Sequence, residues 1–225
     1  MTLGAQDAIP VSAGARAVLE GLYASPRVAD PRDPDGPPLE VFPTSIPVEH
    51  AVLLAETVRD NDLVRTLETG MAYALSTLAI AGVHADRDAG RHVAIDPIQS
   101  TKWRSLGREN LRRAGIERFV EVVEERSDEA LPRMAAEGQA CDFAFIDGHH
   151  LFDFVLVDFF YVDRMLVEGG IVAFHDPWIP AVARVIDFLR TNRDRDYELA
   201  RADEGLALLR KVGTDERDWD HWRPF

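Results

Sequence analysis

Two kinds of segment alternate along this chain after residue 62. Short runs rich in Val, Ile, Leu and Phe are typical of strands that are buried on both faces of a sheet. Such runs occupy residues 63–69, 92–97, 119–126, 141–148 and 169–176. Longer runs with apolar residues at helical spacing separate them, at residues 71–84, about 99–114, about 127–137 and 151–167. This alternation predicts an α/β fold of the Rossmann-like, doubly wound type.

The end of the pattern departs from strict alternation. A helical run at 181–192 is followed by two strand-like runs, 197–203 and 206–212, with a very short turn at Glu204-Gly205 between them. A turn this short joins antiparallel strands, because a parallel pair needs a long crossover. We therefore expect a seven-stranded sheet that is mostly parallel and ends in a C-terminal antiparallel hairpin.

The N-terminal part follows a different pattern. A helical run at 13–23 precedes residues 28–38, where Pro, Asp and Gly are too frequent for a regular element. We expect residues 1–44 to form an N-terminal helix and a Pro-rich loop, and residues 45–225 to form the main domain, which opens with a helix at Pro47. The loop is either a simple linker or a lid over the site, since long irregular segments often are lids.

The composition of the chain limits the kinds of partner that it is expected to bind. The chain has 225 residues, 46% hydrophobic, enough for one substantial core. Its net charge of −14 repels phosphate backbones, so we expect no nucleic-acid partner. Cys141 is the only cysteine and cannot form an internal disulfide; it is expected to be a core residue, and the chain to be cytoplasmic. No apolar run is long enough to span a bilayer, so no membrane association is expected.

The first strand ends in Glu68-Thr69-Gly70, at the kind of position where open parallel sheets bind ligands. Gly70 allows a sharp turn and a close backbone approach, and the helix start beyond it offers free N–H groups to an anionic ligand. Asp96 ends the second strand, where a carboxylate can accept hydrogen bonds from both hydroxyls of a ribose. The alternative role of Asp96 is to cap the helix expected to begin near Gln99.

Acidic residues and histidines end the fourth and fifth strands. Asp147 and Asp176 are expected at one edge of the sheet, where two carboxylates would suit Mg²⁺. His175 precedes Asp176 directly; an alternative is that only one of this pair enters the site, because neighbouring strand residues point to opposite faces. His150 titrates near neutral pH and could accept a hydroxyl proton; otherwise it caps a helix or faces solvent.

Taken in order, the motifs LETGMAYALST, VAID, and FIDGHH followed by GGIVAFHD resemble the class I S-adenosylmethionine-dependent methyltransferases. More narrowly, they are similar to the small-molecule O-methyltransferases of the methyltransferase 24-like family. The resemblance covers residues 45–212. It implies an enzyme that transfers a methyl group from S-adenosylmethionine to a hydroxyl of a small molecule, by direct displacement. Related methyltransferases often dimerise, so a homodimer is one of the open alternatives.

The resemblance also implies roles for single residues. Glu68 and the Gly70 backbone would hold the amino-acid end of the cofactor, Asp96 its ribose, and the corner at Ser127-Asp128 its adenine; Ser127 or Asp128 could instead cap the next helix. Alanine stands at position 74, where the family usually has a second glycine. The full set of implied cofactor-binding residues is Glu68, Thr69, Gly70, Ala74, Ser76, Asp96, Ser127, Asp128 and Asp147.

For the chemistry, the resemblance implies His150 as the base, three residues after Asp147, and Asp147, His175 and Asp176 as ligands of a divalent metal. The family's metal triad is more often all-oxygen. The His-Asp pair at 175–176 therefore weakens the case for Mg²⁺ or shifts it toward a metal that tolerates imidazole.

Two other functions compete with this interpretation. An NAD(P)-dependent oxidoreductase on the same general fold is disfavoured, because the first loop lacks Gly-x-Gly-x-x-Gly and no Tyr-x-x-x-Lys pair occurs. A catalytically inactive, cofactor-binding partner protein is supported by the missing second glycine at Ala74 and by the unusual His175-Asp176 pair.

Overall fold

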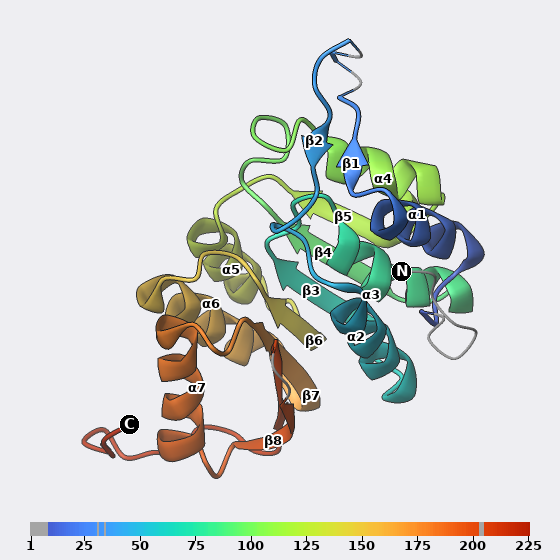
Figure 1. Ribbon diagram of the computed structural model, residues 1–225. Helices are drawn as coiled ribbons and strands as arrows, with labels where there is room; N and C mark the ends of the chain where they lie inside the picture. Colours follow the sequence, from blue (N-terminus) through green and yellow to red (C-terminus); the bar gives the residue numbers. More distant parts are fainter. Residues whose placement is uncertain (1–8, 31, 34, 203–204) are drawn as a thin grey trace. The chain divides into compact units, whose positions relative to one another are not determined.

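A computed structural model describes residues 9–30, 32–33, 35–202 and 205–225 of the chain. Its main strands are β3 (Arg65–Thr69), β4 (Arg91–Ile95), β5 (Val120–Val123), β6 (Cys141–Ile146), β7 (Leu166–His175), β8 (Tyr197–Ala202) and β9 (Leu206–Lys211). They form one sheet in the order β5-β4-β3-β6-β7-β9-β8 (Figure 1). The pairs β4–β5, β3–β6 and β6–β7 are parallel, whereas β7–β9 and β9–β8 are antiparallel. The predicted fold is confirmed, including its C-terminal hairpin; Glu204 of the predicted turn lies outside the described residues.

The chain packs as two compact units. The first comprises Met1–Val64 and Met71–Glu125, and the second comprises Arg65–Gly70 and Arg126–Phe225. Strand β3 thus belongs to the second unit, and the residues that follow Gly70 belong to the first. The boundary that the sequence predicts at residue 44, between an N-terminal part and the main domain, is a different division and stays a prediction.

Four helices pack together in the first unit: α1 (Ala13–Ala24), α2 (Val48–Asp60), α3 (Leu75–Arg87) and α4 (Leu106–Ala114). Helix α1 contacts α3 and α4, and α2 contacts α3. The fully buried side chains of Leu19, Leu54 and Leu78 come from three of these helices. The Pro-rich loop is irregular, as predicted, and only the short antiparallel pair β1 (Arg27–Val28) and β2 (Leu39–Glu40) flanks it.

Helices α3 and α4 begin later than the apolar pattern predicted. Helix α3 starts at Leu75 instead of residue 71, and α4 at Leu106 instead of residue 99. In each case the preceding residue is left-handed, with φ of 69° at Ala74 and 61° at Ser105. A right-handed helix cannot include such a residue. A short 3-10 helix (η1, Glu117–Phe119) then leads into β5.

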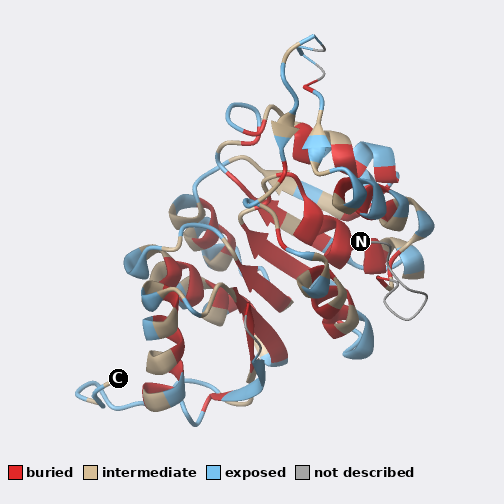
Figure 2. Ribbon diagram, viewed as in Figure 1, coloured by how far each residue is buried: buried red, intermediate tan, exposed pale blue. Residues whose placement is uncertain are grey.

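The second unit stacks α5 (Ser127–Ala136), α6 (Phe152–Met165) and α7 (Pro180–Asn192) in sequence, with α6 in contact with both neighbours. Strands β3, β6 and β9 are buried along most of their length, whereas β8 is mostly exposed (Figure 2). Cys141 opens β6 and is a free, buried core residue, as predicted; burial raises the pKa of its thiol to about 12. Among the described residues, no helix combines the length and apolarity needed to cross a membrane.

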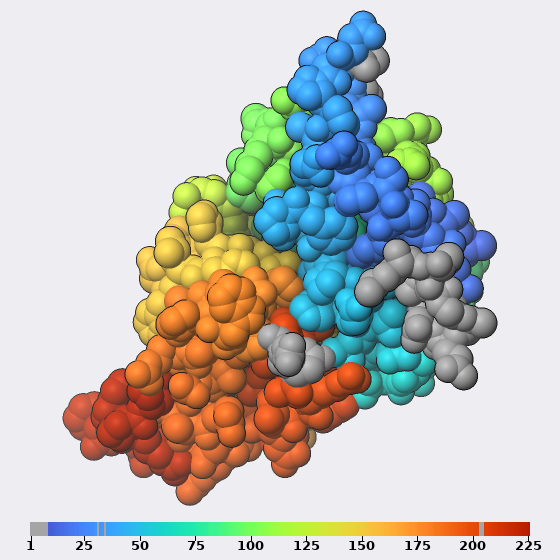
Figure 3. Space-filling view, in the orientation of Figure 1, coloured from blue at the N-terminus to red at the C-terminus, as the bar shows by residue number. Residues whose placement is uncertain are grey.

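The C-terminal tail packs back onto α7. The side chain of Asn192 hydrogen-bonds both the N–H and the carbonyl oxygen of Arg223, at 2.8 Å each. The Phe225 ring contacts that of Phe188. Trp219 stays exposed, and Figure 3 shows this tail in dark red at the surface.

Candidate functional site

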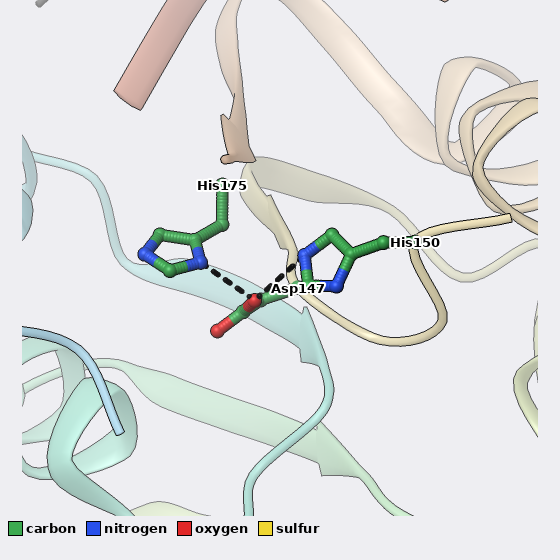
Figure 4. A group of neighbouring side chains, drawn as sticks. All are labelled: Asp147, His150 and His175. Atoms are coloured by element: carbon green, nitrogen blue, oxygen red, sulfur yellow. Dashed lines mark ion pairs between the residues drawn. The ribbon is translucent and has the colours of Figure 1, made fainter. Parts of the chain in front are cut away.

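Polar side chains from two neighbouring strand ends meet in the second compact unit (Figure 4). Asp147 follows β6, His175 ends β7, and His150 lies in the loop before α6. His175 Nδ1 is 3.0 Å from Asp147 Oδ1, and His150 Nε2 is 3.5 Å from the same oxygen. The parallel pairing of β6 with β7 places both strand ends at one edge, so the structure brings these residues together as expected.

Asp176 joins this group as well. Its Oδ2 lies 3.4 Å from His175 Nδ1 and 3.7 Å from His150 Nε2. The alternative in which only one residue of the His175-Asp176 pair enters the site is therefore wrong. Asp176 has a left-handed backbone (φ 52°), which breaks the alternation of a regular strand. Trp178 donates a hydrogen bond from Nε1 to Asp176 Oδ1 at 3.1 Å and is exposed, so it is not a core residue.

The local charges favour a cation. Burial alone would lower the pKa of His175, but its hydrogen bond to Asp147 and the charges of Asp147 and Asp176 outweigh burial and raise that pKa. A neighbouring carboxylate favours the charged form of an imidazole in this way. The same negative potential would attract a divalent metal ion. A metal ion is bound by neutral imidazole, so the protonated form would give way to the neutral form when the metal binds.

The donor set suits a metal that tolerates imidazole. One ligand atom each from Asp147, His150 and His175 can be chosen so that all lie within 4.8 Å of one another. This set contains His150 in place of Asp176, which was predicted as a metal ligand. Within the described part of the chain, His150 Nε2 makes no hydrogen bond. Two imidazoles with a carboxylate match transition metals better than Mg²⁺, which prefers oxygen ligands.

The end of β3 belongs to the same compact unit. Glu68 and Thr69 are buried, and Asp147 N donates a hydrogen bond to the Thr69 carbonyl oxygen at 3.0 Å. Gly70 has φ of 86°, and a Cβ placed on it would lie 2.2 Å from the Asp147 carbonyl oxygen. Gly70 thus lies against the backbone beside the polar cluster, where no other residue type fits; its close approach to a ligand stays a prediction.

In the first compact unit, Asp96 is buried and holds the loop that precedes α3. Its Oδ2 accepts hydrogen bonds from Met71 N at 3.1 Å, from Ala72 N at 2.8 Å and from Gln99 Nε2 at 3.1 Å. Its Oδ1 accepts from Ile98 N at 3.0 Å, which is an Asx-type turn. The expected cap of a helix near Gln99 is therefore wrong, because no helix begins there; ribose binding by Asp96 stays a prediction.

Ala74 has a left-handed backbone. Its φ is 69° and its ψ is 27°, and its N–H donates to the Met71 carbonyl oxygen at 2.7 Å. An alanine adopts these dihedrals at a cost of about 1–2 kcal/mol. Ser76 is buried in the first turn of α3. Both positions stay predicted cofactor contacts.

The corner after β5 differs in detail from the prediction. Helix α5 begins at Ser127, its N-cap is Arg126, and no side chain caps it. The capping role considered for Ser127 and Asp128 is therefore wrong. The Asp128 carboxylate instead accepts two hydrogen bonds from the Arg126 guanidinium, at 2.9 and 2.8 Å. Adenine contact from this corner stays a prediction.

Sequence reasoning missed Asp158, a buried carboxyl group in α6 that is 1% exposed. Burial raises its pKa to about 6. A sequence signal did exist: Asp158 occupies an apolar stripe of α6 between Val155 and Val162, where a solvated acid would not be placed.

The sheet order with its terminal hairpin and the polar strand ends define a class I S-adenosylmethionine-dependent methyltransferase fold. Residues 67–177 match the family described as a methyltransferase domain. This segment runs from β3 to just past β7 and includes every residue of the polar cluster. This match confirms the resemblance to the S-adenosylmethionine-dependent methyltransferases seen in the sequence.

Solved structures share this fold. The O-methyltransferase TomG from Streptomyces achromogenes, involved in tomaymycin synthesis and in complex with SAM, is 18% identical (TM-score 0.65; 90% of this chain and 91% of TomG covered). The O-methyltransferase from Bacillus cereus in complex with SAH is 18% identical (TM-score 0.65; 90% and 92% covered). SAH-bound PaMTH1 from Podospora anserina is 17% identical (TM-score 0.66; 90% and 89% covered). A search of curated proteins finds no significant match.

Proposed function

We propose that this methyltransferase transfers the methyl group of S-adenosylmethionine to a hydroxyl oxygen of a small molecule, beside Asp147, His150 and His175. The observation that carries the proposal is the convergence of these three side chains at the ends of β6 and β7. The two neighbours named as O-methyltransferases, with SAM or SAH bound, support the choice of donor and of oxygen as acceptor.

In direct displacement the protein's main contribution is alignment of the hydroxyl, the methyl carbon and the sulfur. The hydroxyl must also lose its proton as the new bond forms. His150 is part exposed and lies 3.5 Å from Asp147, so it can meet a bound acceptor and its protonated form has a carboxylate partner. Asp147 and His150 are therefore the proposed catalytic residues.

A divalent metal offers a second arrangement of the same groups. Asp147, His175 and Asp176 were the predicted ligands, and His150 fits the set equally well. Bound there, a metal ion would lower the pKa of the acceptor hydroxyl. His150 cannot be both ligand and base through the same Nε2 atom, so the two arrangements exclude each other at this residue.

The cofactor contacts are proposed within each compact unit. In the second unit they are Glu68, Thr69, Gly70, Ser127, Asp128 and Asp147; in the first they are Ala74, Ser76 and Asp96. Support comes from the Gly70 turn and from the left-handed backbone of Ala74, which stands where the family usually has a glycine.

Calorimetry tests the proposal directly. Wild-type protein should bind S-adenosylmethionine and its product S-adenosylhomocysteine, and should show no heat with NADH. Binding of NADH alone would overturn the proposal in favour of an oxidoreductase. A screen of phenols, sugars and hydroxy acids with radiolabelled donor then separates an enzyme from a cofactor-binding partner, because only the enzyme labels an acceptor.

The location and the partners of the protein are inferred from its composition. We place the protein in the cytoplasm on the basis of its single, buried, free cysteine, and we expect no nucleic-acid partner because of its charge of −14. A homodimer, and a lid role for residues 1–44, are proposals of the same kind; light scattering of the purified chain tests the first.

A further inference from the structure

Residues 71–74, directly before α3, have a backbone that is unfavourable for their sequence. Ala72 has φ of 44° and Ala74 has φ of 69°, so two alanines in this short loop are left-handed. Such residues persist only where the surrounding structure holds them, and they cluster at ligand sites. The side chains that hold this loop therefore bear on its proposed part in cofactor binding.

Gln99 is a fully buried side chain that joins this loop to Asp96. Its Nε2 donates to the Ala72 carbonyl oxygen at 2.7 Å and to Asp96 Oδ2 at 3.1 Å. The same Oδ2 atom accepts the N–H groups of Met71 and Ala72. The reverse orientation of the amide would place its Oε1 against two acceptors, so these bonds fix its direction. The carboxylate thus holds the N–H groups of the loop, and the amide holds a carbonyl oxygen.

Helix α4 supplies a second buried amide to the same loop. Asn110 is 1% exposed, and its Nδ2 donates to the Tyr73 carbonyl oxygen at 3.0 Å. Gly107 lies three residues earlier, and a Cβ placed on it would be 2.6 Å from the Ala72 carbonyl oxygen. Because a side chain at position 107 would collide with the loop backbone, α4 lies directly against the loop.

We propose that Gln99 and Asn110 are positioning residues, which hold residues 71–74 in the shape that binds S-adenosylmethionine. The loop leads to Ala74, and Gln99 also holds Asp96; both are proposed cofactor contacts. The two amides are buried, so they act through the loop and do not touch the ligand. A loop that is already ordered loses less conformational entropy on binding, which strengthens affinity. The inference rests on the proposed function, since it assigns this loop to the cofactor.

Gln99→Met is the first test, because it nearly keeps the volume of the side chain and removes both donated hydrogen bonds. We expect affinity for S-adenosylhomocysteine, measured by calorimetry, to fall about tenfold, the value of one or two hydrogen bonds. The midpoint of thermal unfolding should fall as well, because the Ala72 carbonyl oxygen loses its partner.

Val58→Ala separates this effect from a general loss of stability. Val58 is fully buried in α2, in the same compact unit as Gln99. Its truncation leaves a cavity and should lower the unfolding midpoint. Affinity for S-adenosylhomocysteine should stay unchanged in this control when it is measured well below both midpoints. An equal loss of affinity in Val58→Ala and Gln99→Met would make Gln99 a purely structural residue and overturn the inference.

Asn110→Asp is an independent second test, and it carries the inference if Gln99→Met does not fold. It keeps the volume and replaces the donating NH₂ by an oxygen, so the Tyr73 carbonyl oxygen loses its donor and affinity should fall several-fold. Arg113→Gln is its control, because Arg113 is exposed and donates to Asn110 Oδ1, at the other end of the amide; affinity should not change. Unchanged affinity in either folded test variant, while the wild type binds, refutes the inference. A wild type that binds no S-adenosylhomocysteine refutes the proposed function instead.

Discussion

Ala74 shows how one residue can depart from a motif and still keep its geometry. It holds a left-handed conformation at the start of α3, which costs an alanine about 1–2 kcal/mol. Ala74→Gly should relieve this strain. Part of the gain in stability is lost, because glycine has a larger conformational entropy in the unfolded state. We expect a net gain of about 0.5–1 kcal/mol in the free energy of unfolding, measured by urea denaturation.

Ala79→Gly provides the contrast for that experiment. Ala79 is fully buried within the same helix, where glycine costs about 1 kcal/mol. The two substitutions should therefore shift the urea midpoint in opposite directions. A loss of stability in both would mean that Ala74 carries no backbone strain.

Asp158 predicts a dependence of stability on pH. Burial and the Asp128 charge raise its pKa to about 6, against the lowering effect of Ser127 and Thr69. The folded state therefore holds this proton more tightly than the unfolded state, whose pKa is about 4. The contribution of Asp158 to stability is largest below pH 4, falls as the pH rises from about 4 to about 6, and is level above that.

The contribution of this one group is measured as the difference between wild type and Asp158→Asn. That difference should change by about 3 kcal/mol across the window from pH 4 to pH 6, since each unit of pKa is worth about 1.4 kcal/mol. Parallel urea titrations of both proteins at several pH values give it. Curves that stay a constant distance apart would show that Asp158 has an ordinary pKa.

At the scale of elements, most strands were predictable because they are short runs rich in Val, Ile, Leu and Phe that end in a polar residue. The hairpin followed from its short turn. The starts of α3 and α4 were missed because periodicity says nothing about left-handed backbone, which Ala74 and Ser105 adopt. For the same reason the sequence left open whether both His175 and Asp176 enter the site; Asp176 has a positive φ and lies beside His175 there.

The loop between β6 and α6 carries two histidines with different surroundings, which gives a test of the metal arrangement. His150 reaches Asp147 and Asp176, whereas the His149 ring contacts Phe154. Protein dialysed against EDTA should bind Mn²⁺ or Zn²⁺ in calorimetry, and His150→Ala should weaken that binding at least tenfold. His149→Ala should bind as the wild type does.

The outcomes also decide the role of His150. Equal metal affinity in both histidine variants would exclude His150 as a ligand and leave it as the proposed base. Full methyl transfer after exhaustive EDTA treatment would exclude the metal arrangement altogether. Preference for Mg²⁺ over Mn²⁺ and Zn²⁺ would contradict a donor set with two imidazoles.

At the scale of the whole molecule, S-adenosylhomocysteine should stabilise the folded chain by mass action, because it binds the folded state and not the unfolded chain. At a hundred times its Kd it should raise the free energy of unfolding by about 2.7 kcal/mol, and calorimetric scans should show a higher midpoint of unfolding. NADH at equal concentration should leave the scan unchanged. An unchanged midpoint with S-adenosylhomocysteine at this concentration would contradict the proposed cofactor.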